Sequence, residues 1–236
     1  MSLGRALAAE IVKYRRSTIL AVTIAVPVIV TLAWLVSLRV LPAGIVCGRY
    51  VYPFLRAPWA VLFLPLTVQA MAAISCELER ASGGWRALLA QPVSRASLYA
   101  AKLIVLEALV LLSAMVFSAG TWLAGLVVEL PDSAPPGRLL AISSTGAVTA
   151  GPILALQLWL STRLRSLFWP IAIVSTGTVG LLTLAIIEER RPWSMAVDVL
   201  AENRPGPRVL AYVGAAMLAV LFAAIGMRDF ARKDME

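Results

Sequence analysis

Ionisable and aromatic side chains gather in one short stretch of this otherwise apolar chain, between residues 77 and 95. The stretch holds two carboxylates, three arginines, one tryptophan and a pair of leucines: Glu77, Glu79, Arg80, Trp85, Arg86, Leu88, Leu89 and Arg95. Helical spacing puts Trp85 and the leucines on one face of a short amphipathic helix that ends at Pro92. A small apolar patch rimmed by charge is typical of a contact with a protein partner. A helix lying on the lipid surface is the alternative.

The residue types that most hydrolytic and metal-dependent chemistry needs are missing. The sequence has no histidine and only 2 cysteines, which removes the commonest metal ligand, the Ser–His pair and a thiolate cluster. None of the lysines, Lys13, Lys102 and Lys233, follows a phosphate-binding G-x-x-x-x-G-K-[ST] loop. No expected membrane span contains an aspartate, so an intramembrane aspartyl pair is excluded as well. We therefore predict that the chain is not an enzyme and holds no metal or cofactor.

Few ionisable or amide side chains fall inside the expected spans, and three of them are candidates for a polar role: Glu107, Gln69 and Gln157. Glu107 is the main ionisable one, and an ionisable residue inside a bilayer is by default a functional-site hypothesis. We favour the structural explanation, in which Glu107 pairs with Lys102, five residues earlier, or with another cation. Gln69 and Gln157 are neutral, and we expect them to hydrogen-bond between helices.

The composition requires a lipid-facing surface around these residues. Hydrophobic residues make up 60% of the 236 residues and charged residues 14%, against about 45–50% and about 25% in soluble domains. A hydrocarbon core about 30 Å thick needs about 20 apolar residues in helix. Six segments qualify, at 18–38, 57–76, 98–126, 139–161, 167–187 and 208–227. We predict an all-α integral membrane protein with one domain, 1–236, in which 188–208 is either re-entrant or a plain loop.

The distribution of basic residues indicates the orientation. An even number of spans puts both termini on one side, where thirteen of the 21 Lys and Arg residues fall, with eight on the other side. Because cytoplasmic loops are enriched in Lys and Arg, both termini are predicted to be cytoplasmic. The Arg-rich loop 39–56 is the exception. The net charge of +8 has the same explanation, since no basic patch interleaved with aromatics indicates nucleic-acid binding.

The segment before the first span predicts a helix lying in the membrane interface. Leu3, Leu7, Ile11 and Tyr14 recur at helical spacing. The charged residues lie mainly off this stripe: Arg5, Glu10, Lys13 and Arg16. The alternative is a basic flank that only sets the topology, but a stripe of this length exceeds what a flank needs.

The stretch 77–102 resembles the permease subunits of ABC-2 type ABC transporters. The matching pattern is Glu77-x-Glu79-Arg80, Gly84-Trp85-Arg86-x-Leu88-Leu89, Pro92-Val93-Ser94-Arg95 and Leu98-Tyr99-x-x-Lys102. Within that group the chain is most similar to lantibiotic immunity permeases. The further matches are Lys13-x-Arg15-Arg16-Ser17, Leu158-Trp159-Leu160-Ser161, Arg165-Ser166 and Pro192-Trp193.

This resemblance implies partners and a function. A separate ABC ATPase subunit would bind the ATP, and a second copy or a homologous permease would complete the transporter. The stretch from Glu79 to Leu89 would be the coupling helix that docks on the ATPase, and the N-terminal helix would be the connecting helix beside it.

The implied function is export of a lantibiotic or a similar amphipathic peptide from the bacterial plasma membrane, for self-immunity. Export of another drug or a lipid, or a non-transporting scaffold or sensor role, are the alternatives. The Arg-rich loop and the few intramembrane polar groups depart from the family.

Overall fold

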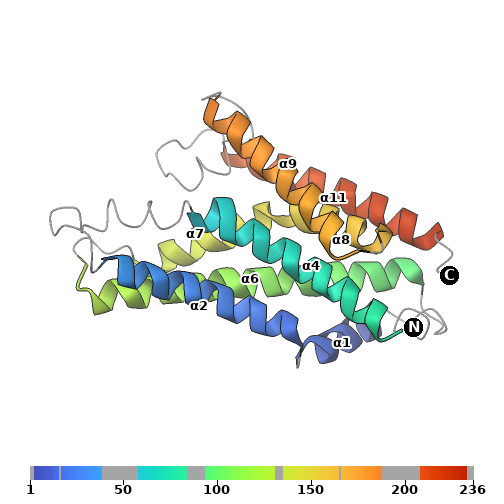
Figure 1. The fold of residues 1–236 in the computed structure, drawn as a ribbon, viewed down its shortest axis with the longest axis horizontal. Coiled ribbons are helices and arrows are strands. Elements are labelled where there is room, and N and C mark those ends of the chain that lie inside the picture. Colours follow the sequence, from blue (N-terminus) through green and yellow to red (C-terminus); the bar gives the residue numbers. More distant parts are fainter. Residues whose placement is uncertain are drawn as a thin grey trace.

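The computed structural model describes residues 3–15, 17–38, 58–83, 94–130, 135–164, 166–187 and 208–232. Within these ranges the chain is helical without strands, and its helices form an elongated bundle (Figure 1). In chain order the elements are α1 (Leu3–Tyr14), α2 (Thr18–Leu38), η1 (Trp59–Phe63), α4 (Leu64–Ala81), α6 (Arg95–Val127), α7 (Pro136–Thr149), α8 (Gly151–Arg163), α9 (Phe168–Ile187) and α11 (Arg208–Arg232). The predicted all-α class is therefore confirmed.

Five helical stretches in the described part of the chain are long and apolar enough to cross a membrane. They are Thr18–Leu38, Trp59–Ala81, Arg95–Val127, Pro136–Arg163 and Val213–Arg232. The segment 167–187, expected as a further span, corresponds to α9, whose described side chains give only a shorter apolar helix, Phe168–Gly180. The total of six spans thus stays a prediction, and residues 39–57 and 188–207 lie outside the described residues.

Both termini lie at the same end of the bundle (Figure 1). This end, called the α1 end below, contains α1, the last turns of α4, α8 and α11, and the first turn of α6. Arg95 at the start of α6 donates a hydrogen bond of 3.5 Å to the carbonyl of Ala231 near the end of α11. Which side of the membrane this end faces stays a prediction.

The helix that contains the second span is longer than expected. The predicted boundary at residue 76 is wrong, because α4 continues to Ala81 and carries Glu77, Glu79 and Arg80 in its last turns. The Glu77–Arg80 ion pair, with i,i+3 spacing, supports this extension. Gly83 follows with φ of 64°, a left-handed conformation that glycine adopts at low cost and that commonly ends helices. The next helix begins at Arg95, where the Ser94 side chain caps it by accepting a hydrogen bond from Ser97 N at 3.2 Å.

The expected fourth span is interrupted in its middle. It consists of α7 and α8, separated at Ala150, and Pro152 stands in the first turn of α8. Proline is tolerated at that position because the first backbone N–H groups of a helix have no intrahelical partner. Pro65 likewise stands at the start of α4, directly after the π-helical turn η1.

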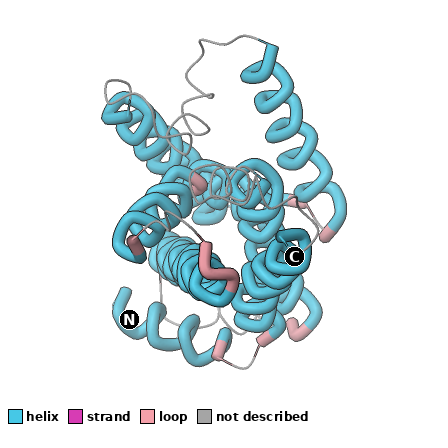
Figure 2. Tube along the Cα trace, turned by 90° about the vertical axis from the view of Figure 1, so that its left-hand side faces the viewer, coloured by secondary structure: helices cyan, strands magenta, loops and turns pink. Residues whose placement is uncertain are grey.

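Helix α6 lies at the centre of the bundle and contacts α1, α2, α4, α7, α8 and α11. Figure 2 looks along the bundle and shows helices lying side by side. Away from the α1 end, the Trp59 and Phe117 rings stack with centroids 4.2 Å apart. Where α2 crosses α6, a Cβ atom added to Gly120 would lie 3.0 Å from Thr31 Oγ1, so the two backbones approach closely only because residue 120 is glycine.

Candidate functional site: a buried ionic cluster at the α1 end

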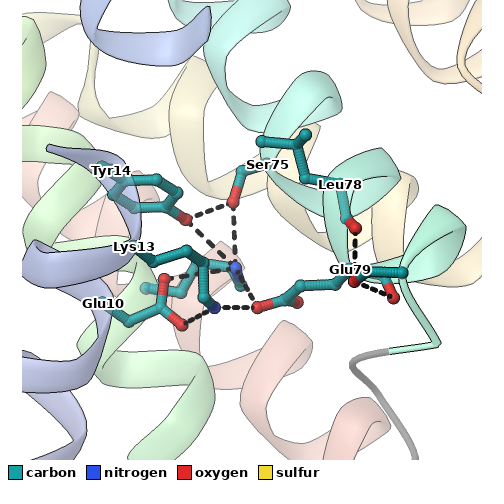
Figure 3. A network of polar contacts seen from close by, with 8 residues as sticks. Glu10, Lys13, Tyr14, Ser75, Leu78 and Glu79 are labelled. Atoms are coloured by element: carbon teal, nitrogen blue, oxygen red, sulfur yellow. Dashed lines mark hydrogen bonds and ion pairs between the residues drawn. The ribbon is translucent and has the colours of Figure 1, made fainter. Parts of the chain in front are cut away.

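Four ionisable side chains from three helices meet inside the α1 end. Glu10 and Lys13 come from α1 and Glu79 from α4 (Figure 3). Lys102 comes from α6. The side chains of Glu10, Glu79 and Lys102 are at most 4% exposed, and that of Lys13 is 29% exposed. Two carboxylates and two ammonium groups balance in charge. Such pairing is the condition under which charges are found buried.

Lys102 is the centre of the cluster. Its Nζ lies 2.9 Å from Glu79 Oε1 and 3.4 Å from Glu10 Oε2. It also donates to Ser75 Oγ at 2.9 Å and to the Tyr14 hydroxyl at 3.1 Å. An ammonium group has three N–H donors, so these four acceptors saturate it. Lys102 therefore binds α6 to both α1 and α4.

Lys13 closes the cluster on its outer side. Its Nζ lies 2.7 Å from Glu10 Oε1 and also pairs with Glu79 Oε1, which thus bridges both ammonium groups. Tyr14 and Ser75 are joined by a hydrogen bond between their hydroxyls. The second carboxylate oxygen of Glu79, Oε2, is buried and has no hydrogen-bond partner among the described residues. The α1–α4 contact therefore consists of the Lys13–Glu79 ion pair and the Tyr14–Ser75 hydrogen bond.

The electrostatics of α1 agree with an ionised cluster. Burial by itself would raise the pKa of Glu10, but Lys102 and Lys13 outweigh this effect and hold the pKa below its ordinary value. Burial raises the pKa of Tyr14 well above its ordinary value. Glu10 is therefore a carboxylate and Tyr14 a neutral hydroxyl near neutral pH.

The inward face of α1 differs from the one that the sequence suggests. Ala6, Glu10 and Tyr14 are buried, whereas Ile11 is 58% and Val12 73% exposed. Glu10 was expected to lie off the apolar stripe, and it does, but it is buried because Lys102 of α6 supplies an ammonium partner inside the bundle. The outward face of α1 instead carries the apolar residues Leu3, Ile11 and Val12. A position of α1 in the membrane interface stays a prediction.

A second polar contact joins α4 to α8. Arg80 donates through Nη2 to the carbonyls of Ser161 and Leu164, at 2.8 and 3.3 Å, and pairs through Nη1 with Glu77. The last carbonyls of a helix lack intrahelical partners and carry partial negative charge. Arg80 thus caps the C-terminal end of α8, and Glu77 orients its guanidinium.

A third contact joins α8 to α11 at the same end. Trp159 Nε1 donates to Asp229 Oδ2 at 3.1 Å, and Arg163 Nη1 lies 3.2 Å from Asp229 Oδ1. Every helix with an end in this region is therefore tied to a neighbour by at least one charged or hydrogen-bonded side chain, apart from α2 and α9.

The predicted coupling residues divide into two groups. Glu77, Glu79, Arg80 and Arg95 all lie at the α1 end. The others, Trp85, Arg86, Leu88 and Leu89, lie outside the described residues. Sequence reasoning missed the roles of Glu10, Lys13, Lys102, Tyr14 and Ser75. One signal was available, since Lys13 and Lys102 both stand at the expected cytoplasmic ends of spans, where their charges can meet Glu79.

Gln69 and Gln157, the two amide residues of the expected spans, differ in their hydrogen-bond partners. Gln69 accepts a hydrogen bond of 2.8 Å from Ser175 Oγ of α9, which is the interhelical contact expected for it. Gln157 instead bonds to Ser161 within α8, at 3.3 Å, so the interhelical bond expected for it is not found among the described residues. Its Oε1 atom is buried without a hydrogen-bond partner there.

Glu107 does not pair with Lys102. Positions five residues apart on a helix point roughly 140° away from each other, and Lys102 pairs with Glu79 and Glu10. Glu107 faces α8 instead, where its Oε2 lies 3.9 Å from the place that a Gly151 Cβ would occupy.

The arrangement defines a class of protein. Long apolar helices, joined at one end by ionic contacts that face the interior, form a multi-pass helical membrane protein. Within the described ranges, no three His, Cys, Asp or Glu side chains are grouped as metal ligands. The polar residues at the α1 end hold helices together through ion pairs and hydrogen bonds.

The family follows from a comparison with known proteins. Residues 6–180 match the model of the ABC-2 family transporter proteins, and the chain belongs to this family. The matched range includes the whole ionic cluster. No individual curated protein is similar enough to count as a relative. The chain is thus a membrane-spanning component of an ABC transporter.

Proposed function

We propose that this chain is the permease subunit of an ATP-driven exporter that expels a lantibiotic or a similar amphipathic peptide from the bacterial plasma membrane. A separate ABC ATPase subunit binds and hydrolyses the ATP, and the α1 end faces that subunit in the cytoplasm. The observation that carries this proposal is the position of the ionic cluster, on the last turns of α4, directly before the expected coupling segment.

The contacts at the α1 end provide a route for the work of ATP hydrolysis. Glu79 connects α4 to α1 and α6, and Arg80 connects α4 to α8. A displacement of the segment after Ala81 would therefore move several helices together. Allosteric transitions of this kind use rigid elements that shift against packed interfaces.

The substrate class is supported by the apolar character of the spans and by the resemblance to immunity permeases. An amphipathic peptide concentrates in the membrane interface. A permease with few intramembrane charges can take such a peptide laterally from the leaflet. A second copy of the chain, or a homologous permease, would form the other half of the translocation path.

The proposed ATPase partner is tested first by purification. The chain is extracted from its native cell in mild detergent, and co-purifying proteins are identified by mass spectrometry. An ABC ATPase in stoichiometric amount is the expected result. Its reproducible absence, with the chain intact, would favour a non-transporting membrane scaffold and sink the proposal.

The coupling assignment is tested in the purified complex. Trp85→Ala and Glu79→Ala are each expected to abolish substrate-stimulated ATP turnover while membrane insertion persists. Glu129→Ala, at the opposite end of α6, is the matched control and should keep normal turnover. Normal turnover in both test variants would refute the assignment.

The substrate class needs a cellular test. A strain that lacks the chain should become sensitive to a lantibiotic, and a plasmid-borne copy should restore resistance. Unchanged lantibiotic sensitivity together with sensitivity to an unrelated drug would indicate drug export instead.

A further inference from the structure

Glu107 holds a carboxylate at a junction of three helices, apart from the ionic cluster. A Cβ atom placed on Gly151 of α8 would lie 3.9 Å from Glu107 Oε2 and 3.6 Å from the Cβ of Ala219 in α11. The carboxylate of α6 therefore lies where α8 and α11 meet. The two neighbours, Gly151 and Ala219, are among the smallest residues and offer the carboxylate no charged group.

This junction lies deep in the membrane-spanning part of the bundle. Gly151 is near the middle of the stretch Pro136–Arg163, and Ala219 is near the middle of Arg208–Arg232. From Arg163 back to Gly151 the helix rises about 18 Å at about 1.5 Å per residue, within a hydrocarbon core about 30 Å thick. Glu107 is thus close to the middle of the bilayer.

The carboxylate has no counter-ion there. Among the described residues, the Glu107 side chain has no ion pair and no hydrogen-bond partner. The helix break at Ala150 falls at the same depth, directly before Gly151. Carboxylates inside membranes are costly and are usually paired, and interrupted helices near the midplane are typical of places where transporters hold substrate.

The site is open on its lipid side. Glu107 is only partly buried, and Ile104, one turn before it on α6, is 48% exposed. A molecule dissolved in the leaflet can therefore approach the carboxylate laterally along the exposed face of α6.

The surroundings select among possible cations. A metal ion such as Mg²⁺ or Ca²⁺ needs about six oxygen ligands, whereas the described residues supply a single carboxylate at this junction. A protonated amine needs only one counter-ion, and its own alkyl part can pack against the apolar helix surfaces. The lone carboxylate, the small neighbours and the lipid-side opening all fit such a group.

We infer that Glu107 is the counter-ion for a protonated amine of the transported substrate, held at the α6–α8–α11 junction within the bilayer. The inference rests on the proposed export function for the natural ligand, a cationic amphiphile. The site itself can be tested without ATP or a partner subunit.

The first test uses carboxyl modification of the unaltered chain in lipid nanodiscs. Dicyclohexylcarbodiimide, which reacts with protonated carboxyls in apolar surroundings, is applied, and modification of Glu107 is followed by mass spectrometry. Dodecylammonium should slow the modification at least tenfold relative to dodecanol at the same membrane concentration, because an ion pair keeps the carboxylate deprotonated. Equal rates with both amphiphiles would overturn the inference.

The second test uses ligand-induced thermal stabilisation. Dodecylammonium should raise the unfolding temperature of the unaltered chain more than dodecanol does, since a ligand that binds only the folded state stabilises it. Glu107→Gln should lose this difference, and Glu129→Gln, the matched control, should keep it. A difference that persists in Glu107→Gln would overturn the inference. If Glu107→Gln does not fold, the modification rates of the unaltered chain decide.

The two proposals fail in distinguishable ways. Absence of a co-purifying ATPase contradicts the export function and leaves the ammonium preference measurable. Loss of the ammonium preference, with an ATPase present, contradicts the Glu107 site alone.

Discussion

Lys102 of α6 and Glu79 of α4 form an ion pair of 2.9 Å between side chains that are each 3% exposed. Replacing a whole buried ion pair by apolar residues is often neutral for stability, while removing one partner is strongly destabilising. The pair therefore adds little net stability compared with apolar residues, but it fixes the relative positions of α1, α4 and α6. That role suits a protein in which motion must pass between helices.

Lys102→Met is expected to destabilise the protein by about 3–5 kcal/mol, because Glu10 and Glu79 lose their most buried counter-ion. The measurement is thermal unfolding of the purified chain in detergent. The double variant Glu79→Leu with Lys102→Met should recover most of the loss, since no charge is then left without its main partner.

Lys13→Met is the matched control for this prediction. Lys13 is 29% exposed and Lys102 remains beside both carboxylates, so the loss should be clearly smaller. Equal losses for the two lysines would show that burial does not set the strength of the cluster.

Acid should weaken the attachment of α1. The pKa of Glu10 in the folded chain lies below the ordinary value of 4.5. A lowered folded-state pKa gives stability that is fully present above the ordinary value and is lost as the pH falls through the folded-state value. Unfolding temperature should therefore be flat from about pH 6 to 7 and fall below about pH 4.5.

Glu10→Gln separates this residue from other carboxyls. The variant should be less stable at pH 7 and should show a shallower decrease in acid. Glu129→Gln, exposed at the opposite end of α6, should follow the unaltered chain. An identical acid slope in Glu10→Gln would contradict the assignment of the pH effect to Glu10.

The sequence predicts the helices better than it predicts their partners. Hydropathy locates the spans, because about 20 apolar residues are enough to identify one. The extension of α4 to Ala81 was missed because charged residues were read as the end of the span. Glu79 turns inwards to ammonium groups on α1 and α6, and Arg80 reaches backbone carbonyls at the end of α8.

The contacts of single charged residues depend on rotation about the helix axis, which spacing along one helix does not define. Glu10 was predicted only to lie off the apolar stripe of its helix, and its burial against Lys102 of α6 was not foreseen. Glu107 was assigned to Lys102 by proximity in sequence, yet it faces Gly151. Lys102 is 92 residues from Glu10 along the chain, and Gly151 is 44 residues from Glu107 (151 − 107). Only the packing of the bundle brings these residues close together.

A close contact between α6 and α11 gives a packing prediction. A Cβ atom added at Gly226 would lie 2.6 Å from Tyr99 Cζ, closer than real Cβ contacts. Tyr99 is 2% exposed and cannot move freely. Gly226→Ala should therefore cost about 1–3 kcal/mol through overpacking, measured as a lower unfolding temperature in detergent.

Gly214, on the same helix, supplies the control. A Cβ atom there meets nothing within 4 Å, so Gly214→Ala should be neutral or slightly stabilising because alanine favours helix. Combining Gly226→Ala with Tyr99→Leu should restore part of the stability. A harmless Gly226→Ala would show that the α6–α11 contact is looser than the structure indicates.

A substitution at Arg80 can separate an effect on coupling to the ATPase from an effect on stability. Its guanidinium contacts two carbonyls at the end of α8, at 2.8 and 3.3 Å, while Glu77 holds its other side. Lysine keeps the charge but lacks the planar fork that reaches two acceptors at once. Arg80→Lys should thus lower the unfolding temperature only slightly, yet reduce substrate-stimulated ATP turnover in the complex with the proposed ATPase.

Arg163→Lys is the matched control and should leave turnover unchanged. Arg163 is 57% exposed and binds Asp229 from outside the α4–α8 contact. Equal turnover in Arg80→Lys and Arg163→Lys would mean that α4 does not transmit motion to α8 through this contact.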